Sequence, residues 1–174
     1  KNKNISEIKD LTTKFFENQF PNFNNLIEKF LEDDTLSLIL KYLYIVKNDN
    51  EENKRFLLLK DIENTPYGSV HELYHPYILN LVKLSGADDI YLIDGSKGRI
   101  IYSYAKKPDF GSQIHRSLLL ETELASIYFK SKNEKPKNII ISNISPYPPD
   151  KFLSSIFIGI KLNENNNLLV LKFN

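Results

Sequence analysis

The chain has 174 residues, of which 41% are hydrophobic and 26% charged, the proportions of an ordinary globular domain. Its 23 Lys and Arg residues nearly balance 22 Asp and Glu residues, so the net charge of +1 gives no electrostatic footprint for nucleic acid. The lack of Cys excludes disulfide bonds, thiolate metal sites and a Cys nucleophile. This length favours a single domain over residues 1–174, mainly helical in 1–86 and forming a sheet in 87–174.

The first part of the chain has the apolar spacing of amphipathic helices. Apolar residues recur every three or four positions over residues 5–33, interrupted by Pro21, which predicts one kinked helix or two helices end to end. A further helix is predicted over 35–46, with Asp34 or Thr35 as its N-terminal cap. We expect these helices to pack on the sheet or to offer a dimer face.

The middle of the chain changes from helical spacing to strand alternation. Residues 64–86 are predicted to be helical, punctuated by Pro76 and closed by Gly86, where a glycine cap is expected. Two runs rich in Ile, Leu and Tyr then flank the turn "DGSKG", which predicts a β-hairpin over residues 88–106. Residues 108–130 return to helical spacing.

The last part of the chain has the pattern of β-strands. Strands are predicted over residues 137–147, 154–163 and 167–174, the last two joined by the Asn-rich turn "NENNN". Helices therefore come first, followed by two strands, a helix and three strands. This order predicts an α+β domain in which long N-terminal helices pack on a five-stranded, mostly antiparallel sheet.

The sequence "HELYH" raises the question of a zinc peptidase. On a helix His71 and His75 would lie one turn apart, and Glu72 could activate a metal-bound water. Pro76 would clash with the carbonyl of Glu72 in a regular helix, so the helix could start at or near Pro76 instead. A third ligand is missing from the motif, since His115 lies in a different element. We therefore predict no metal, no cofactor and no catalytic residue, and keep the zinc peptidase as the less favoured alternative.

A longer pattern offers another interpretation of this motif. Over residues 67–114, a helix carrying "H..YHP" leads into the strand "DIYLID", a "DG" turn, the strand "GRIIYSY" and the segment "K-x-x-DFG", and "ISPYPPDKF" follows later. Together these resemble the extracytoplasmic sensing domains of bacterial chemoreceptors and related membrane sensors of the Cache group, over roughly residues 67–174. The resemblance implies a PAS-like fold with a long N-terminal helix along the sheet. It also implies anchoring in the inner membrane, with this domain in the periplasm.

Candidate ligand-binding residues follow from the second strand and from this resemblance. Alternation places Tyr102, Tyr104 and Lys106 on one face of the strand. In a Cache-like layout this face lies near Asp109 and Tyr147, where aromatic walls and a few polar groups make a small-molecule site. Lys106 is expected to pair with a ligand carboxylate, and Asp109 to hold an amine or to anchor its loop. Tyr residues on half-buried sheet faces also serve packing alone.

The predicted function is therefore noncatalytic sensing. A small molecule, for which an organic acid is one candidate, would bind this domain of a chemoreceptor or sensor kinase and shift its conformation. Pairing of the N-terminal helices predicts a homodimer. The chain has no Trp, so it departs from the signature of amino-acid-sensing Cache domains. Recognition of a protein partner is the alternative, which a filled pocket and an exposed apolar patch would favour.

Overall fold

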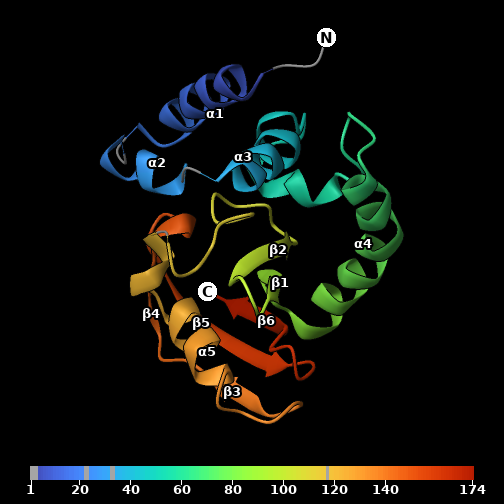
Figure 1. Ribbon diagram of the computed structural model, residues 1–174, viewed down its shortest axis with the longest axis vertical. Helices are drawn as coiled ribbons and strands as arrows, with labels where there is room; N and C mark the ends of the chain where they lie inside the picture. The colour runs from blue at the N-terminus through green and yellow to red at the C-terminus, as the bar shows by residue number, and fades with distance from the viewer. Residues whose placement is uncertain (1–3, 22–23, 32–33, 117) are drawn as a thin grey trace.

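The computed structural model describes residues 4–21, 24–31, 34–116 and 118–174 (Figure 1). The α-helices are α1 (Ile5–Gln19), α2 (Asn24–Phe30), α3 (Thr35–Lys41), α4 (Pro66–Ser85) and α5 (Glu123–Ser131). Shorter turns are the π-helix η2 (Tyr42–Val46) and the 3₁₀-helices η3 (Glu52–Leu57), η4 (Leu118–Glu121) and η5 (Pro148–Asp150). The strands are β1 (Asp89–Asp94), β2 (Arg99–Ser103), β3 (Ile139–Ile141), β4 (Ser145–Tyr147), β5 (Leu153–Lys161) and β6 (Leu168–Phe173).

The described strands form one sheet. Its order is β2-β1-β6-β5-β3, and β4 also pairs with β5. Every pairing between described strands is antiparallel. The predicted α+β class and antiparallel sheet are therefore confirmed, but the sheet has six strands rather than the predicted five.

The additional strand arises because the strand predicted over residues 137–147 is broken. Its two halves, β3 and β4, pair with β5 one after the other along the chain. At the break the Oγ of Ser142 accepts the N–H of Phe157 (2.9 Å) and donates to the carbonyl of Asn143 (2.7 Å). Because a side chain takes over a bond of the ladder, regular backbone pairing stops there. Local alternation of residue types gives no signal of such an interruption.

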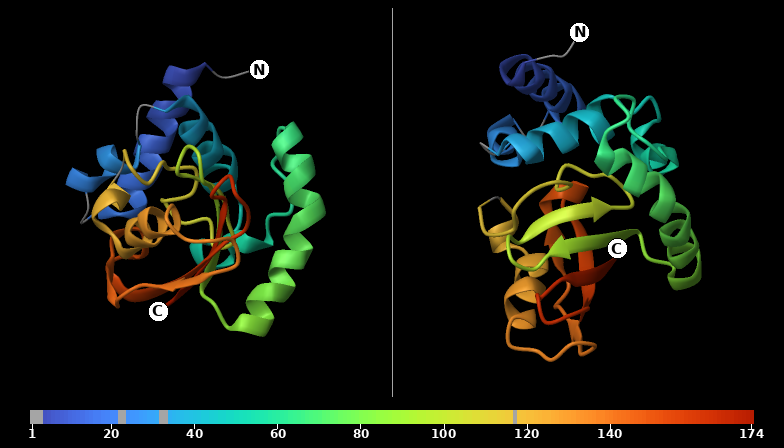
Figure 2. Two further views of the ribbon diagram at one scale, coloured as in Figure 1. Left: turned by 60° about the horizontal axis from the view of Figure 1, so that its bottom comes forward. Right: turned by 45° about the vertical axis from the view of Figure 1, so that its right-hand side comes forward.

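α1 and α2 match the predicted alternative of two successive helices, and α3 with η2 spans the helix predicted over 35–46, but these helices do not cover a sheet face. α1 ends just before Pro21, as the missing N–H of proline requires. α1 packs against α2, α3 and η2, and α2 packs against η4. Figures 1 and 2 show these helices stacked beyond one end of the sheet. The predicted packing of a long N-terminal helix along the sheet is therefore not confirmed, because the apolar stripes of these helices bury one another. Residues 22–23 and 32–33 of the predicted range lie outside the described residues.

Two predicted helix caps are present. The Oδ1 of Asp34 accepts the N–H groups of Leu36 (2.9 Å) and Ser37 (3.1 Å) at the start of α3. Gly86 ends α4 in the left-handed conformation (φ 70°), with its N–H bonded to the carbonyl of Val82. Both ends were set by local chemistry that the sequence shows directly.

Helix α4 confirms the helix predicted over residues 64–86, and it continues through Pro76 instead of starting near it. The ring of Pro76 leaves the carbonyl of Glu72 without its usual helical donor. The helix nevertheless spans 20 residues, since Thr65 caps its start by accepting the N–H of Gly68 (3.0 Å). Figure 2 shows α4 as a long rod beside the sheet. The side chains of His71 and His75 consequently share its buried face.

Most of the helix predicted over residues 108–130 is a loop. Gly111 lies in the left-handed region (φ 84°), and a Cβ there would be 3.2 Å from the carbonyl oxygen of Ser37 on α3. Regular helix is confined to η4 and α5, after the loop has crossed the sheet end. Residue 117 lies outside the described residues. This loop carries Asp109, so its path decides where a predicted site residue lies.

Helix α5 covers what we call the inner face of the sheet, which bears Tyr91, Phe157, Gly159, Val170 and Lys172. A single core cluster extends from this face into the N-terminal helices. In Figure 1 α5 crosses in front of β5.

Replacement of Gly159 by Ala is expected to lower the free energy of unfolding by about 1–3 kcal/mol. A Cβ at this position would lie 2.4 Å from the Cγ2 of Ile127 on α5, so the helix would have to move off the strand. Urea denaturation measures the change. The exposed Ser154→Ala on the same strand serves as control and is expected to shift stability by less than about 0.5 kcal/mol. Equal stability of the two variants would contradict this packing.

Candidate functional site

Polar side chains form a buried cluster on the inner face, between the sheet and the loop that follows β2. The hydroxyl of Tyr147 donates a hydrogen bond of 2.7 Å to the Oδ2 of Asp109. The hydroxyl of Tyr91 lies against the same buried carboxyl group and interacts with it. The ammonium of Lys172 lies 5.7 Å from the centre of the Tyr147 ring.

Burial controls the charge of the two carboxyl groups of this cluster. It raises the pKa of Asp109, although hydrogen bonds and nearby Lys172 act in the opposite direction. Burial and the neighbouring Asp109 also raise the pKa of Asp89 to about 7, against hydrogen bonds from Ala105 and Ser103. The two carboxyl groups therefore resist carrying two negative charges together near neutral pH.

A chain of ion pairs leads from this cluster toward the surface. Lys172 pairs with the Oδ2 of Asp150, and Lys107 lies 3.0 Å from its Oδ1. Lys107 also contacts Glu52 at 3.4 Å, and Glu52 pairs with Lys151 at 2.8 Å. These five residues, which we call the ion-pair chain, come from η3, the loop after β2, η5 with its following residue, and β6. Ion pairs thus connect segments that lie far apart in the sequence.

The ion-pair chain borders an open cleft of about 390 Å³. One wall is aromatic, because the rings of Phe56 and Tyr104 stack with centres 5.0 Å apart and planes 18° from parallel. The cleft is lined by Glu52, Asn53, Phe56, Val82, Ala87, Asp88, Tyr104, Ala105, Lys107, Asp150, Leu153 and Asn174. Its volume lies within the roughly 300–1,000 Å³ of small-molecule sites.

The alternation predicted for the second strand ends at Ser103. There the chain bends, and the carboxylate of Asp89 accepts the N–H of Ala105 (2.9 Å) and the hydroxyl of Ser103 (3.0 Å). Lys106 follows in the left-handed region (φ 53°). Tyr104 therefore lines the cleft, whereas Tyr102 projects from the opposite face of the sheet toward α4. The five predicted residues do not form one pocket.

Lys106 is fully buried instead of lining a cleft. Its ammonium approaches the carbonyl of Tyr104 at 3.4 Å and lies 6.0 Å from the centre of the Tyr102 ring. Burial lowers the pKa of Lys106 to about 7, although the charge of Asp89 favours the protonated form. Its side chain does not line the cleft beside the ion-pair chain. We therefore do not assign ligand recognition to Lys106.

The two histidines of "HELYH" pack as a pair, with ring centres 4.5 Å apart. Both nitrogens of His75 are occupied, since Nδ1 accepts from the hydroxyl of Tyr102 (2.5 Å) and Nε2 donates to the carbonyl of Phe56 (2.6 Å). His71 donates through Nδ1 to the carbonyl of Leu59 (2.6 Å). Glu72 lies at the surface, 3.3 Å from Lys60. Among the described residues, no group of three His, Cys, Asp or Glu side chains is placed to hold a metal.

Of the predicted site residues, the structure joins Asp109 to Tyr147 and brings Tyr104 to the cleft. Sequence reasoning missed the ion-pair chain. One signal was available, because alternation along 167–174 places Lys172 on the same side as the apolar Leu168 and Val170. A lone lysine at a buried strand position requires a buried partner. That partner, Asp150, could not be identified from the pattern.

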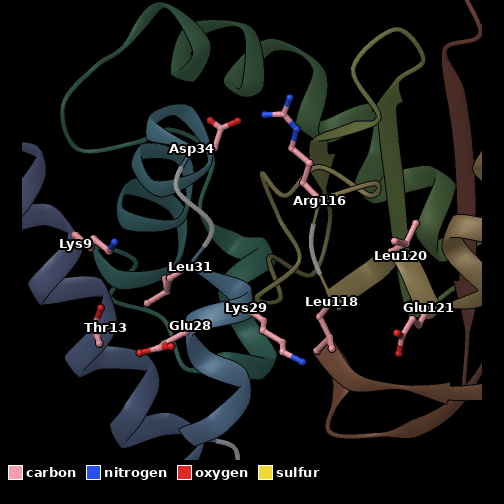
Figure 3. A pocket seen from close by; sticks show the side chains of 10 residues that line it. All are labelled: Lys9, Thr13, Glu28, Lys29, Leu31, Asp34, Arg116, Leu118, Leu120 and Glu121. Carbon is pink, nitrogen blue, oxygen red and sulfur yellow. The ribbon is translucent and has the colours of Figure 1, made fainter.

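A larger open cleft of about 870 Å³ lies between α1, α2 and η4 (Figure 3). Its lining carries charges of both signs, including Lys29, Glu28 and Arg116, and Asp34 is already paired with Arg99. Figure 3 shows the lining side chains spread around an open space rather than directed at one point. Convergent polar groups are what mark a binding site, so this cleft carries no functional argument.

Across the described part of the chain, no helix has the length and apolar character needed to cross a bilayer. No protein-family model, curated protein or solved structure matches this chain with significant similarity.

Proposed function

We propose that this chain is the ligand-sensing extracytoplasmic domain of a bacterial transmembrane receptor, a chemoreceptor or sensor kinase with a Cache-type, PAS-like fold. The sequence pattern over residues 67–174 supports this family, and an antiparallel sheet that follows a helical segment is compatible with it. The proposed role is noncatalytic: a small molecule binds one arrangement of the domain more tightly and so shifts its population. The proposal places the domain in the periplasm of an inner-membrane protein and pairs it as a homodimer.

One observation carries the ligand-binding part of this proposal. A line of contacts runs from the open cleft through Asp150 and Lys172 to Tyr147, whose hydroxyl donates to the buried carboxyl group of Asp109. The cleft and the buried carboxyl group of Asp109 are thus linked by side chains that a bound molecule can rearrange. A domain whose parts are held by exchangeable ion pairs can respond to a ligand, because new contacts replace old ones at little net cost.

A thermal-shift screen of the domain against organic acids, amines and amino acids tests this function. A ligand present at about 100 times its Kd is expected to raise the melting temperature by about 5–10 °C. Tyr104→Ala is expected to abolish most of that rise, because it removes the stacked aromatic wall of the cleft. Asp49→Asn, an exposed carboxyl away from the cleft, is the control and is expected to retain it. A screen in which no compound stabilises the domain would contradict the proposal.

Recognition of a protein partner remains the second candidate. The observation in its favour is the exposed apolar edge of the sheet, where Ile139, Ile141 and Ile144 are 66%, 58% and 70% exposed. Exposed apolar patches commonly mark protein interfaces. The cleft and its ion-pair chain have no role in this alternative, so the thermal-shift screen separates the two functions.

A further inference from the structure

We infer that helix α4 pairs with the α4 of a second copy of this chain through an apolar stripe at its surface. The stripe consists of Val70, Tyr74, Tyr77, Leu81 and Leu84. This inference rests on the homodimer of the proposed function, but it moves the interface from the N-terminal helices to α4. Figures 1 and 2 show α4 at the edge of the molecule.

The stripe is not needed to hold α4 in the fold. The helix is anchored by another face, on which His71 and His75 are buried and bonded to backbone carbonyls. In the stripe, by contrast, Tyr77 is 69% exposed and Leu84 is 86% exposed. A surface helix normally presents polar side chains to water, so this second apolar side indicates a partner.

The spacing of the stripe indicates that the partner is another α4. Its residues follow one another at intervals of four, three, four and three positions, the heptad repeat of helices that pack side by side. The repeat is centred on Tyr77, with Val70 and Leu84 seven positions to either side. A stripe that is symmetric about its central residue is self-complementary, as a two-fold pair of identical chains requires. Glu72 and Lys83 project from the other side of the helix, so neither charge opposes close approach.

The exposed area on this side of α4 is sufficient for a dimer. The exposed fraction exceeds one half for each of Val70, Leu73, Tyr74, Tyr77 and Leu84. At roughly 100–150 Å² each, these five side chains offer on the order of 600 Å² per copy. A symmetric pair therefore buries about 1,200 Å², the lower limit for specific protein interfaces.

Pairing at α4 connects the interface to the proposed ligand cleft. Val82, which lies between Leu81 and Leu84 in the sequence, lines the cleft, and α4 leads through Gly86 toward β1. A ligand that displaces Val82 therefore moves α4 against its copy, which couples ligand binding to the dimer.

Sedimentation velocity of the whole chain at concentrations from about 5 to about 500 μM tests the inference. The wild type is expected to dimerise reversibly with a Kd on the order of 10–100 μM, as a small interface allows. Tyr77→Glu places like charges at the centre of the pair and is expected to raise the Kd at least about tenfold. Lys83→Glu, on the other side of the same helix, is the matched control and is expected to leave the Kd unchanged. Far-ultraviolet circular dichroism checks that both variants are folded.

Cross-linking gives a second measurement. The chain has no Cys, so a single introduced thiol can form a disulfide only with a second copy. Tyr77→Cys is expected to give a covalent dimer on mild oxidation, because the central residue meets its own copy whether the two helices run parallel or antiparallel. Lys83→Cys is expected to remain monomeric under the same conditions.

Three results would overturn the inference. A chain that stays monomeric up to about 500 μM would remove the α4 pair and the proposed homodimer together, and the thermal-shift screen would still decide ligand binding. A dimer broken by Ile5→Glu on α1 and not by Tyr77→Glu would place the interface on the N-terminal helices and leave the proposed homodimer standing. A dimer broken only by Ile139→Glu would place the interface at the edge of the sheet.

Discussion

Replacement of Asp150 by Ala is expected to lower the free energy of unfolding by about 3–5 kcal/mol, the usual cost of breaking a buried ion pair from one side. Asp150 is 6% exposed and its partner Lys172 only 2% exposed. Burial raises the pKa of Asp150, but its bonds from Lys172 and Lys107 outweigh this and hold the pKa below its ordinary value. Without Asp150, Lys172 would remain as a buried cation facing Tyr147.

Urea denaturation at pH 7 measures this loss. Lys151→Gln breaks an ion pair at the same end of the sheet, but Lys151 is 49% exposed, so the expected change is below about 1 kcal/mol. The double variant Asp150→Leu, Lys172→Met removes both charges and is expected to recover most of the lost stability. If Asp150→Ala behaved like Lys151→Gln, the ion pair would have to be solvent-exposed, contrary to this structure.

Acidification from pH 7.5 to pH 5 is expected to cost the wild type about 4 kcal/mol relative to a variant with His71→Gln and His75→Gln. Burial, followed by the charge of Lys106, lowers the pKa of His71 to about 3 and that of His75 to about 4. Asp61 acts in the opposite direction on His71. Since an unfolded histidine has a pKa near 6.5, the unfolded chain takes up protons first as the pH falls. Each histidine therefore removes about 2 kcal/mol of stability by pH 5.

The comparison with the variant isolates this effect from the buried carboxyl groups. Asp89, whose pKa is raised to about 7, binds a proton more readily in the folded state and so gains stability as the pH falls. That contribution is present in both proteins and cancels from their difference. Chemical denaturation at several pH values between 7.5 and 5 gives the two curves, and His115→Gln, an exposed histidine, is the control. If the stability curves of the wild type and the variant ran parallel, His71 and His75 would have ordinary pKa values in the folded state, contrary to this prediction.

Local chemistry explains which parts of the fold the sequence predicted. The hairpin around "DGSKG", the Asp34 cap and the Gly86 cap each depend on a few neighbouring residues, and the structure has all three. The break at Ser142 and the loop around Gly111 depend on contacts with Phe157 and α3, far away in sequence. The helical spacing of residues 108–130 could not reveal that tertiary contacts would hold part of this segment as a loop.

The features of the candidate site also divide into those that the sequence predicted and those that depend on the fold. By itself the sequence determined an α+β domain with an antiparallel sheet, because residue periodicity fixes which side chains an element buries. It also singled out Asp109, Tyr147 and Tyr104. Tertiary structure alone decided that Tyr147 meets Asp109 across 38 positions and that Lys151 meets Glu52 across 99. Pairing of buried charges depends on which partner the fold brings within reach, and no local pattern encodes that distance.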